Sequence, residues 1–295
     1  MLLYTLTESC FKRNPLRIER TTKYLLYGSD RLEQNINFGT LADYEETINS
    51  GVEIKKLSLI GLTAQELENL PKSIFKNVEE LDLFYAKYSL KFIEEIKTLK
   101  VVRVNCDRDD LDPNDRIITL WDVSKNPVLE KLILGHPEIT DISKLENSTI
   151  SHFEIERGRY FLEDDLPFKI KTDFSVFLTM KNLRVLKLWV EPIKDNYSNL
   201  VALSKLTELE EIYLPKHYFT FAQFAYLKSK LKKAKGLSPF REFRNRQKDR
   251  FEYMRVGSET PREFVPMSKE LYDIDVAEYE MLAKEFENID TPPKK

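Results

Sequence analysis

Residues 129–134 read Leu-Glu-Lys-Leu-Ile-Leu, and the spacing of the apolar residues in this stretch recurs along much of the chain. Leu129, Leu132 and Leu134 occupy positions one, four and six of a six-residue template. In an extended strand, alternate side chains face opposite sides, so positions four and six point together into a core while position five faces outward. The stretch therefore predicts a short strand that buries one face.

The template occurs seven times in the 295-residue chain. The copies start 21 to 33 residues apart, and their first residues are Ile54, Val78, Leu99, Leu129, Ile150, Leu183 and Leu209. One such strand cannot bury its apolar side alone, whereas stacked copies bury a continuous core. The repetition predicts an α/β fold with a stacked parallel sheet. The alternative is an α/β domain with ordinary helices and no repeat.

The repeats resemble those of the leucine-rich repeat family, in residues 51–237. The phrase at 121–134, Trp-Asp-Val-Ser-Lys-Asn-Pro-Val-Leu-Glu-Lys-Leu-Ile-Leu, is similar to repeats common in bacterial members. The family usually carries Asn or Cys eight positions after the first Leu, where its side chain bonds neighbouring backbone turns. Here only an extra half-repeat beginning at Ile118 reaches an asparagine, Asn126, so a regular asparagine ladder is absent. The resemblance implies a solenoid with its sheet on the concave face and its helices on the convex face.

The segments between the strands carry helix signals. Thr63 with Glu66 and Thr220 with Gln223 fit the capping-box pattern, and Ser89 precedes apolar residues at helical spacing. If the strands line the inside of the bend, these segments return along the outside. They are therefore the predicted convex-side helices.

Residues 1–50 are predicted to form an N-terminal cap. They contain a β-type run at 23–27 and a predicted helix near 41–48. The terminal units of a stacked repeat protein differ from the internal ones because one of their faces has no neighbour. The cap is expected to shield the first repeat.

Residues 238–295 are predicted to form a C-terminal extension. The stretches 240–244 and 250–256 alternate apolar and polar residues and could pair as a β-hairpin. A last helix is expected to begin at Asp275, since apolar residues follow it at helical spacing.

The composition argues against most catalytic and metal sites. Three histidines, two cysteines and eight glycines leave little material for metal clusters, redox pairs or phosphate-binding loops. No nucleotide-binding, serine-hydrolase or zinc-protease motif occurs, and the acid-rich segment 107–115 lacks the glycine and glutamate of a calcium loop. We therefore expect no enzyme activity, no catalytic residue, no metal and no cofactor.

Charge and hydropathy predict a cytoplasmic protein. The chain has 46 Lys and Arg against 49 Asp and Glu, which excludes a globally basic nucleic-acid coat. No secretory signal and no apolar run long enough to span a membrane is visible. We expect reduced thiols and no membrane partner.

The outward positions of the strands are the candidate binding surface. The fifth template positions form a central row, which consists of Ser58, Asp82, Arg103, Ile133, Glu154, Lys187 and Tyr213. Large aromatic residues at outward positions are typical anchors of protein interfaces. The predicted partner-binding residues are Phe84, Arg103, Glu154, Lys187, Trp189 and Tyr213.

A second candidate surface is the basic stretch 228–250, which has ten basic and two acidic residues. Its representative cations are Lys232, Lys233, Arg244 and Arg246. Residues 252–290 hold eleven acidic and four basic residues, so the last helix could instead fold back on the basic stretch.

The predicted function is a non-catalytic protein–protein interaction module that binds its partner on the concave face, such as an adaptor or a toxin-neutralising protein. The alternative is binding of nucleic acid or an acidic partner through 228–250.

Overall fold

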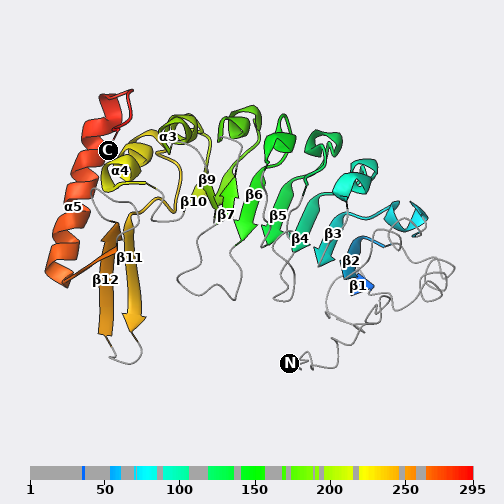
Figure 1. Ribbon diagram of the computed structural model, residues 1–295, viewed down its shortest axis with the longest axis horizontal. Helices are drawn as coiled ribbons and strands as arrows, with labels where there is room; N and C mark the ends of the chain where they lie inside the picture. The colour runs from blue at the N-terminus through cyan, green and yellow to red at the C-terminus, as the bar shows by residue number, and fades with distance from the viewer. Residues whose placement is uncertain are drawn as a thin grey trace, which may run out of the picture.

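The computed structural model describes residues 35–36, 54–60, 70, 72–84, 89–105, 119–135, 141–156, 168–170, 174–188, 190–192, 196–214, 219–245, 250–256 and 264–294. Eight strands of these segments form one parallel sheet in the order β1-β2-β3-β4-β5-β6-β8-β10. The strands are β1 (Asn35–Ile36), β2 (Lys56–Ile60), β3 (Glu80–Phe84), β4 (Val101–Asn105), β5 (Lys131–Gly135), β6 (His152–Glu156), β8 (Val185–Leu188) and β10 (Glu211–Tyr213). They follow an arc, with the sheet on its inner side (Figure 1).

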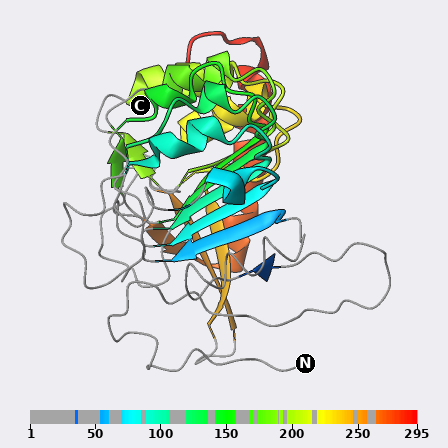
Figure 2. The ribbon, with the colours of Figure 1, turned by 90° about the vertical axis from the view of Figure 1, so that its right-hand side faces the viewer.

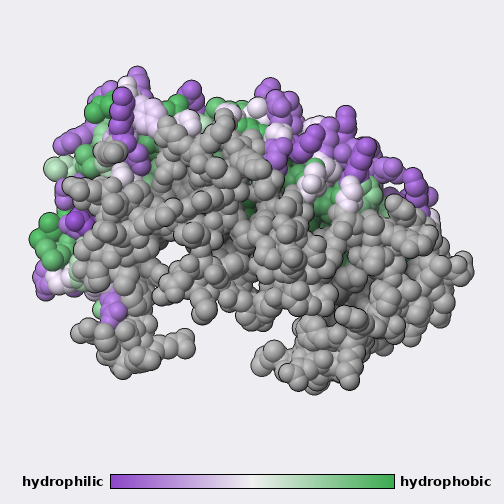
Figure 3. Space-filling view, in the orientation of Figure 1, coloured by the Kyte–Doolittle hydropathy of each residue, from purple (hydrophilic) through white to green (hydrophobic). Residues whose placement is uncertain are grey.

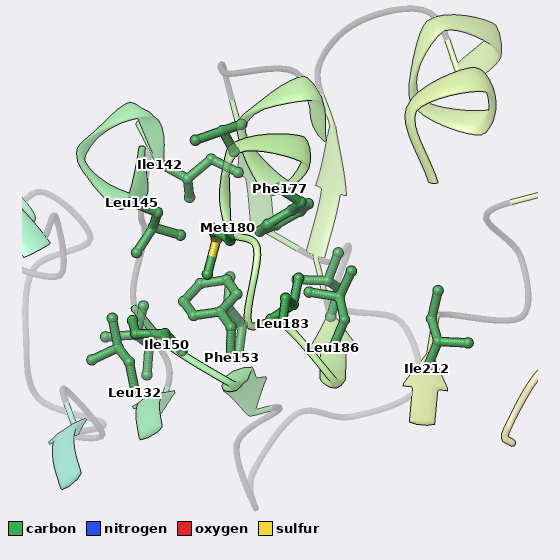
Figure 4. Close-up of a cluster of buried hydrophobic side chains, with 14 of the residues drawn as sticks. Leu132, Ile142, Leu145, Ile150, Phe153, Phe177, Met180, Leu183, Leu186 and Ile212 are labelled. Carbon is green, nitrogen blue, oxygen red and sulfur yellow. The ribbon is translucent and has the colours of Figure 1, made fainter. Parts of the chain in front are cut away.

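The register predicted from the template is confirmed in all seven copies. Every first, fourth and sixth position is buried, with no more than 7% of its surface exposed. Equivalent positions pair across the strands, as Leu57 with Leu81 and Leu81 with Val102. In the close-up, Leu132, Phe153 and Leu186 from successive strands lie in one cluster of apolar side chains (Figure 4). The core therefore runs continuously along the sheet.

A repeated backbone contact joins each unit to the next. The carbonyl oxygen of Lys55 accepts hydrogen bonds from the N–H groups of Glu79 and Glu80, at 2.7 and 2.9 Å. The same pair of bonds is formed by the carbonyl oxygens of Glu79, Lys100, Glu130, Ser151 and Arg184. Glu210 then accepts one such bond, at 2.9 Å, from Lys235. We call each of these contacts a rung.

The segments that return between strands lie on one side of the sheet (Figure 2). Most of them are 3-10 helices: η2 (Lys72–Phe75), η3 (Leu90–Glu95), η5 (Val123–Lys125), η6 (Ser143–Leu145) and η7 (Phe174–Thr179). Among the described residues, only the last two returns contain α-helices, α3 (Asn196–Ser204) and α4 (Phe221–Lys230). The returns that hold η3 and η6 belong to repeats of 21 residues, which leave few residues beyond the strand and its turns. A 3-10 helix spans such a return with fewer residues because it rises further per residue than an α-helix.

Of the three helix starts predicted in the return segments, two lie in the described part of the chain, and both are confirmed. Thr220 forms a capping box with Gln223 at the start of α4. Ser89 caps η3 by accepting a hydrogen bond from the N–H of Lys91, at 3.3 Å. The third, at Thr63, lies outside the described residues.

At the N-terminal side, the described structure is β1, which pairs in parallel with β2. The strand expected at 23–27 and the helix expected near 41–48 lie outside the described residues. The sequence patterns did not indicate β1, because two residues are too few for a periodicity.

The predicted hairpin near the C-terminus is confirmed. β11 (Phe240–Asn245) pairs antiparallel with β12 (Arg250–Val256), and a third strand, β13 (Phe264–Met267), adds to β12. A separate pair of short parallel strands, β7 (Phe168–Ile170) and β9 (Val190–Pro192), stands apart from the main sheet. Neither β13 nor this pair was anticipated.

The predicted start of the last helix was wrong. α5 spans Lys269–Glu285, and Ser268 caps it by accepting a hydrogen bond from the N–H of Leu271. Asp275 lies inside the helix, where its carboxylate is 2.8 Å from Arg255 of β12. The residue that resembled a cap is therefore an ion-pair partner. A short 3-10 helix, η8 (Phe286–Asn288), follows α5.

α5 packs against the end of the stack. The buried ring of Tyr279 lies 5.6 Å, centroid to centroid, from both Phe221 and Phe240. Its hydroxyl donates to the carbonyl oxygen of Phe224, at 3.3 Å, and burial raises the pKa of Tyr279. This aromatic cluster joins α5, α4 and β11.

Candidate functional site

The candidate site is the polar face, which we define as the face of the eight-stranded sheet opposite the 3-10 helices. The predicted central row is continuous across it, because the register pairs each member with the next. Adjacent strands in a sheet lie about 4.8 Å apart, so neighbouring side chains of the row are within contact distance.

Four charged residues form a network at one end of the row. Arg103 lies 3.2 Å from the carboxylate of Asp82, and Lys56 lies 3.8 Å from the same group. Both cations also approach Glu80, with Lys56 at 3.2 Å and Arg103 at 3.9 Å. Arg103, a predicted site residue, thus keeps a place on this face as part of an ion-pair network.

Two members of the row are not exposed as their outward positions had suggested. Asp82 is 7% exposed and Ile133 is 6% exposed. Asp82 lies between two longer cationic side chains on the flanking strands, which account for part of its burial. The face of the sheet to which a side chain points follows from the alternation along the strand, whereas its exposed fraction also depends on the neighbouring side chains.

His152 and Glu154 form a polar pair on β6. Nε2 of His152 lies 2.9 Å from the Glu154 carboxylate. Burial lowers the pKa of His152 from its ordinary value of 6.5, and the nearby cations Lys131 and Lys187 act in the same direction. The hydrogen bond with Glu154 raises the pKa but does not offset burial. At neutral pH the imidazole is uncharged and donates its N–H to the carboxylate.

Lys187 and Tyr213 stand together at the other end of the row. The Lys187 ammonium is 3.2 Å from the carboxylate of Glu211 and 5.3 Å from the centroid of the Tyr213 ring. Tyr213 is 39% exposed, so this end presents an aromatic surface beside a cation. The structure thus brings together two of the predicted site residues.

Of two other predicted site residues, Phe84 is described only by its backbone and Trp189 is not described. The backbone of Phe84 lies in β3, in register with Ile60 and Asn105. Its side chain is outside the described structure, as is the whole of Trp189.

Sequence reasoning missed the row that precedes the central one. His152, Glu80, Lys56 and Glu211 belong to it and supply most of the ion-pair partners of the central row. These residues stand two positions before the central row in each strand, so the same alternation would have placed them on the polar face.

Described lysines of the basic stretch form ion pairs with carboxylates. Lys232 is 3.2 Å from Glu287 and Lys233 is 2.9 Å from Glu208. Lys228 also pairs with Glu280 of α5. The acidic C-terminal segment thus folds back on α4, as the alternative interpretation proposed. The Arg244 side chain and Arg246 lie outside the described structure.

Among the described residues, no three or more His, Cys, Asp or Glu side chains are grouped so that they could hold a metal ion. No described helix combines the length and the apolar character needed to cross a membrane.

No protein-family model matches this chain, and no curated protein matches its sequence.

Proposed function

We propose that the chain is a leucine-rich repeat protein of the bacterial type, with an α/β solenoid at residues 51–237 between an N-terminal cap and a C-terminal extension. The uniform register of seven strands and the repeated rungs support this assignment.

Asn126 supplies independent support. Its amide nitrogen donates to the carbonyl oxygens of Ile93 and Ile96, both at 2.9 Å, in the preceding return segment. Its side-chain oxygen accepts from Nε1 of Trp121, at 2.7 Å. An asparagine that bonds a neighbouring turn is the role that the family resemblance assigns to this position.

We propose further that the protein is a non-catalytic module that binds another protein on the polar face. The observation that carries this proposal is the alternation of charge along the central row. Arg103, Glu154 and Lys187 present both signs, the buried Asp82 pairs with Arg103, and the exposed Tyr213 closes the series. A protein surface can complement such a row, whereas the phosphates of a nucleic acid would require a row of cations.

Adaptors and toxin-neutralising proteins are the classes that this mode of binding suits. The proposal places the protein in the cytoplasm and assigns it no cofactor. Nucleic-acid binding through 228–250 is the competing function, and the ion pairs of Lys232 and Lys233 with acidic residues weigh against it.

The test begins with affinity capture of a partner from the source cell with the whole chain, followed by binding measurements. Tyr213→Ala and Trp189→Ala should each weaken the complex by about 2 kcal/mol, because aromatic anchors dominate many interfaces. Leu178→Ala is the control, since Leu178 is 40% exposed on η7, away from the polar face.

A Trp189→Ala, Tyr213→Ala double variant with unchanged affinity would exclude the polar face. The competing function predicts a different result: neutralising Lys232, Lys233, Arg244 and Arg246 together would abolish binding and remove its salt dependence.

A further inference from the structure

α5 carries a second apolar surface, outside the arc of residues that packs on the protein. Tyr279 and Ala283 are buried at 2% and 6% exposure. Leu271, Ile274 and Met281 are instead 54%, 60% and 57% exposed. At 3.6 residues per turn, these three side chains fall within an arc of about 80° around the helix axis. We call them the α5 stripe.

The stripe is unusual among the exposed apolar residues of the described structure. Val128 and Leu178 are exposed on separate return segments, whereas the stripe gathers three large side chains on one helix. The space-filling view shows apolar surface over α5 at the left edge of the molecule (Figure 3). A surface helix of a single globular unit normally buries its apolar residues, so a second exposed stripe marks an interaction surface.

Acidic side chains share this side of the helix with the stripe. Glu270, Glu278 and Glu285 are exposed, Glu270 about 20° outside the arc that holds the three apolar residues and the other two inside it. Lys284 is also exposed on this side of the helix, near Met281. Apolar and negative side chains therefore alternate along this surface.

We propose that the α5 stripe docks a cationic amphipathic helix of a partner protein. Such a helix would bury its apolar side chains against Leu271, Ile274 and Met281 and place lysines or arginines beside the carboxylates that alternate with them. A second copy of this chain fits less well, because each copy would bring three carboxylates and one lysine to the contact. An anionic membrane surface would be repelled by the same carboxylates.

The probe is a fluorescent synthetic helix built from leucines at positions i, i+3 and i+4 and lysines elsewhere. Its binding to the whole chain is measured by fluorescence anisotropy at low and high ionic strength. We expect saturable binding that Ile274→Gln with Met281→Gln weakens by about tenfold or more. Glu278→Gln with Glu285→Gln should weaken binding at low ionic strength and reduce its salt dependence.

Three controls make the result decisive. Leu178→Gln replaces an apolar residue of η7 and should leave the affinity unchanged. A peptide of the same composition with scrambled order should bind weakly, as should a peptide with glutamates in place of the lysines. Unchanged thermal unfolding would show that the Gln variants remain folded, as their exposed positions predict.

The proposal is overturned if the wild-type chain does not bind the probe saturably, if the scrambled or acidic peptide binds equally well, or if the Ile274→Gln, Met281→Gln variant binds like the wild type. Sedimentation of the chain alone tests the second copy. A wild-type dimer that this variant dissociates would assign the stripe to self-association instead. None of these variants alters the polar face, so the result is independent of the function proposed above.

Discussion

Asn126 connects two return segments through one buried side chain, which is 1% exposed. Asn126→Ala would leave the carbonyl oxygens of Ile93 and Ile96 and the indole N–H of Trp121 without these partners. We expect a loss of about 2–4 kcal/mol in unfolding free energy, measured by urea denaturation, because unpaired buried polar groups are costly.

Asn182→Ala is the matched control for this prediction. Asn182 is exposed and donates one long hydrogen bond, at 3.4 Å, to Thr149. Its replacement should change the free energy of unfolding by no more than about 0.5 kcal/mol. Similar losses for the two variants would mean that Asn126 has no special role.

The strand register makes opposite predictions for adjacent residues. Leu186 is fully buried, so Leu186→Asp would bury an unpaired charge and should unfold the neighbouring repeats. Lys187→Ala removes a partly exposed ion pair and should cost about 1 kcal/mol or less. Thermal unfolding of the two variants, followed by circular dichroism, tests the register, and equal effects would refute it.

His152 makes stability depend on pH. Because burial lowers the pKa of His152 below 6.5, the unfolded chain binds more protons than the folded chain between the two pKa values. The free energy of unfolding should therefore fall as the pH drops through 6.5 towards the folded pKa. His152→Gln should reduce this dependence in denaturation series from about pH 7 to about pH 5. Identical slopes for the two proteins would contradict the prediction.

The buried side of the sheet was predictable residue by residue, since a period of two places Leu132 and Leu134 on the same face. The environment of Asp82 was not. Its burial and its ion pairs with Lys56 and Arg103 depend on register between segments more than twenty residues apart, which one local pattern does not contain. An Asp82→Ala substitution, expected from an exposed outward position to be nearly neutral, should now cost about 1–2 kcal/mol.

At the scale of elements, local sequence patterns leave the type and the starting residue of some helices undetermined. The sequence placed Ser89 correctly as a cap, but the segment after it is a 3-10 helix because the short repeat limits its length. In α5, both Ser268 and Asp275 precede apolar residues at helical spacing. Ser268 is the cap, whereas Asp275 lies inside the helix and pairs with Arg255 of β12. Repeat length decided the first outcome, and a contact between distant segments explains the second.

The two sides of α5 should respond differently to truncation. Tyr279→Ala would open a cavity in the cluster with Phe221 and Phe240 and should cost about 3–5 kcal/mol. Met281→Ala, two residues away on the exposed side, should change the free energy of unfolding by no more than about 0.5 kcal/mol. Chemical denaturation of both variants checks the orientation of the helix, and a larger loss for Met281→Ala would show it to be wrong.

At the scale of the whole molecule, each repeat contacts mainly its neighbours, so stability should pass along the arc from unit to unit. α5 packs on α4, and Lys235, which follows α4, forms the last rung with Glu210. Tyr279→Ala should therefore reduce hydrogen-exchange protection in β10 more than in β3. Peptide-resolved exchange by mass spectrometry measures both segments. A uniform loss along the chain would indicate a single cooperative unit.

The rungs have a consequence for how such a chain can change in length during evolution. Each one consists of backbone atoms only, a carbonyl oxygen and the N–H groups of the next unit, so it requires no particular side chain, except that proline cannot supply an N–H. A duplicated or deleted unit would meet its new neighbour through the same contact, provided that its core positions stayed apolar. The side chains of the polar face can then diverge independently. The binding surface can therefore be extended or recombined by whole units without any change in the rungs that join them.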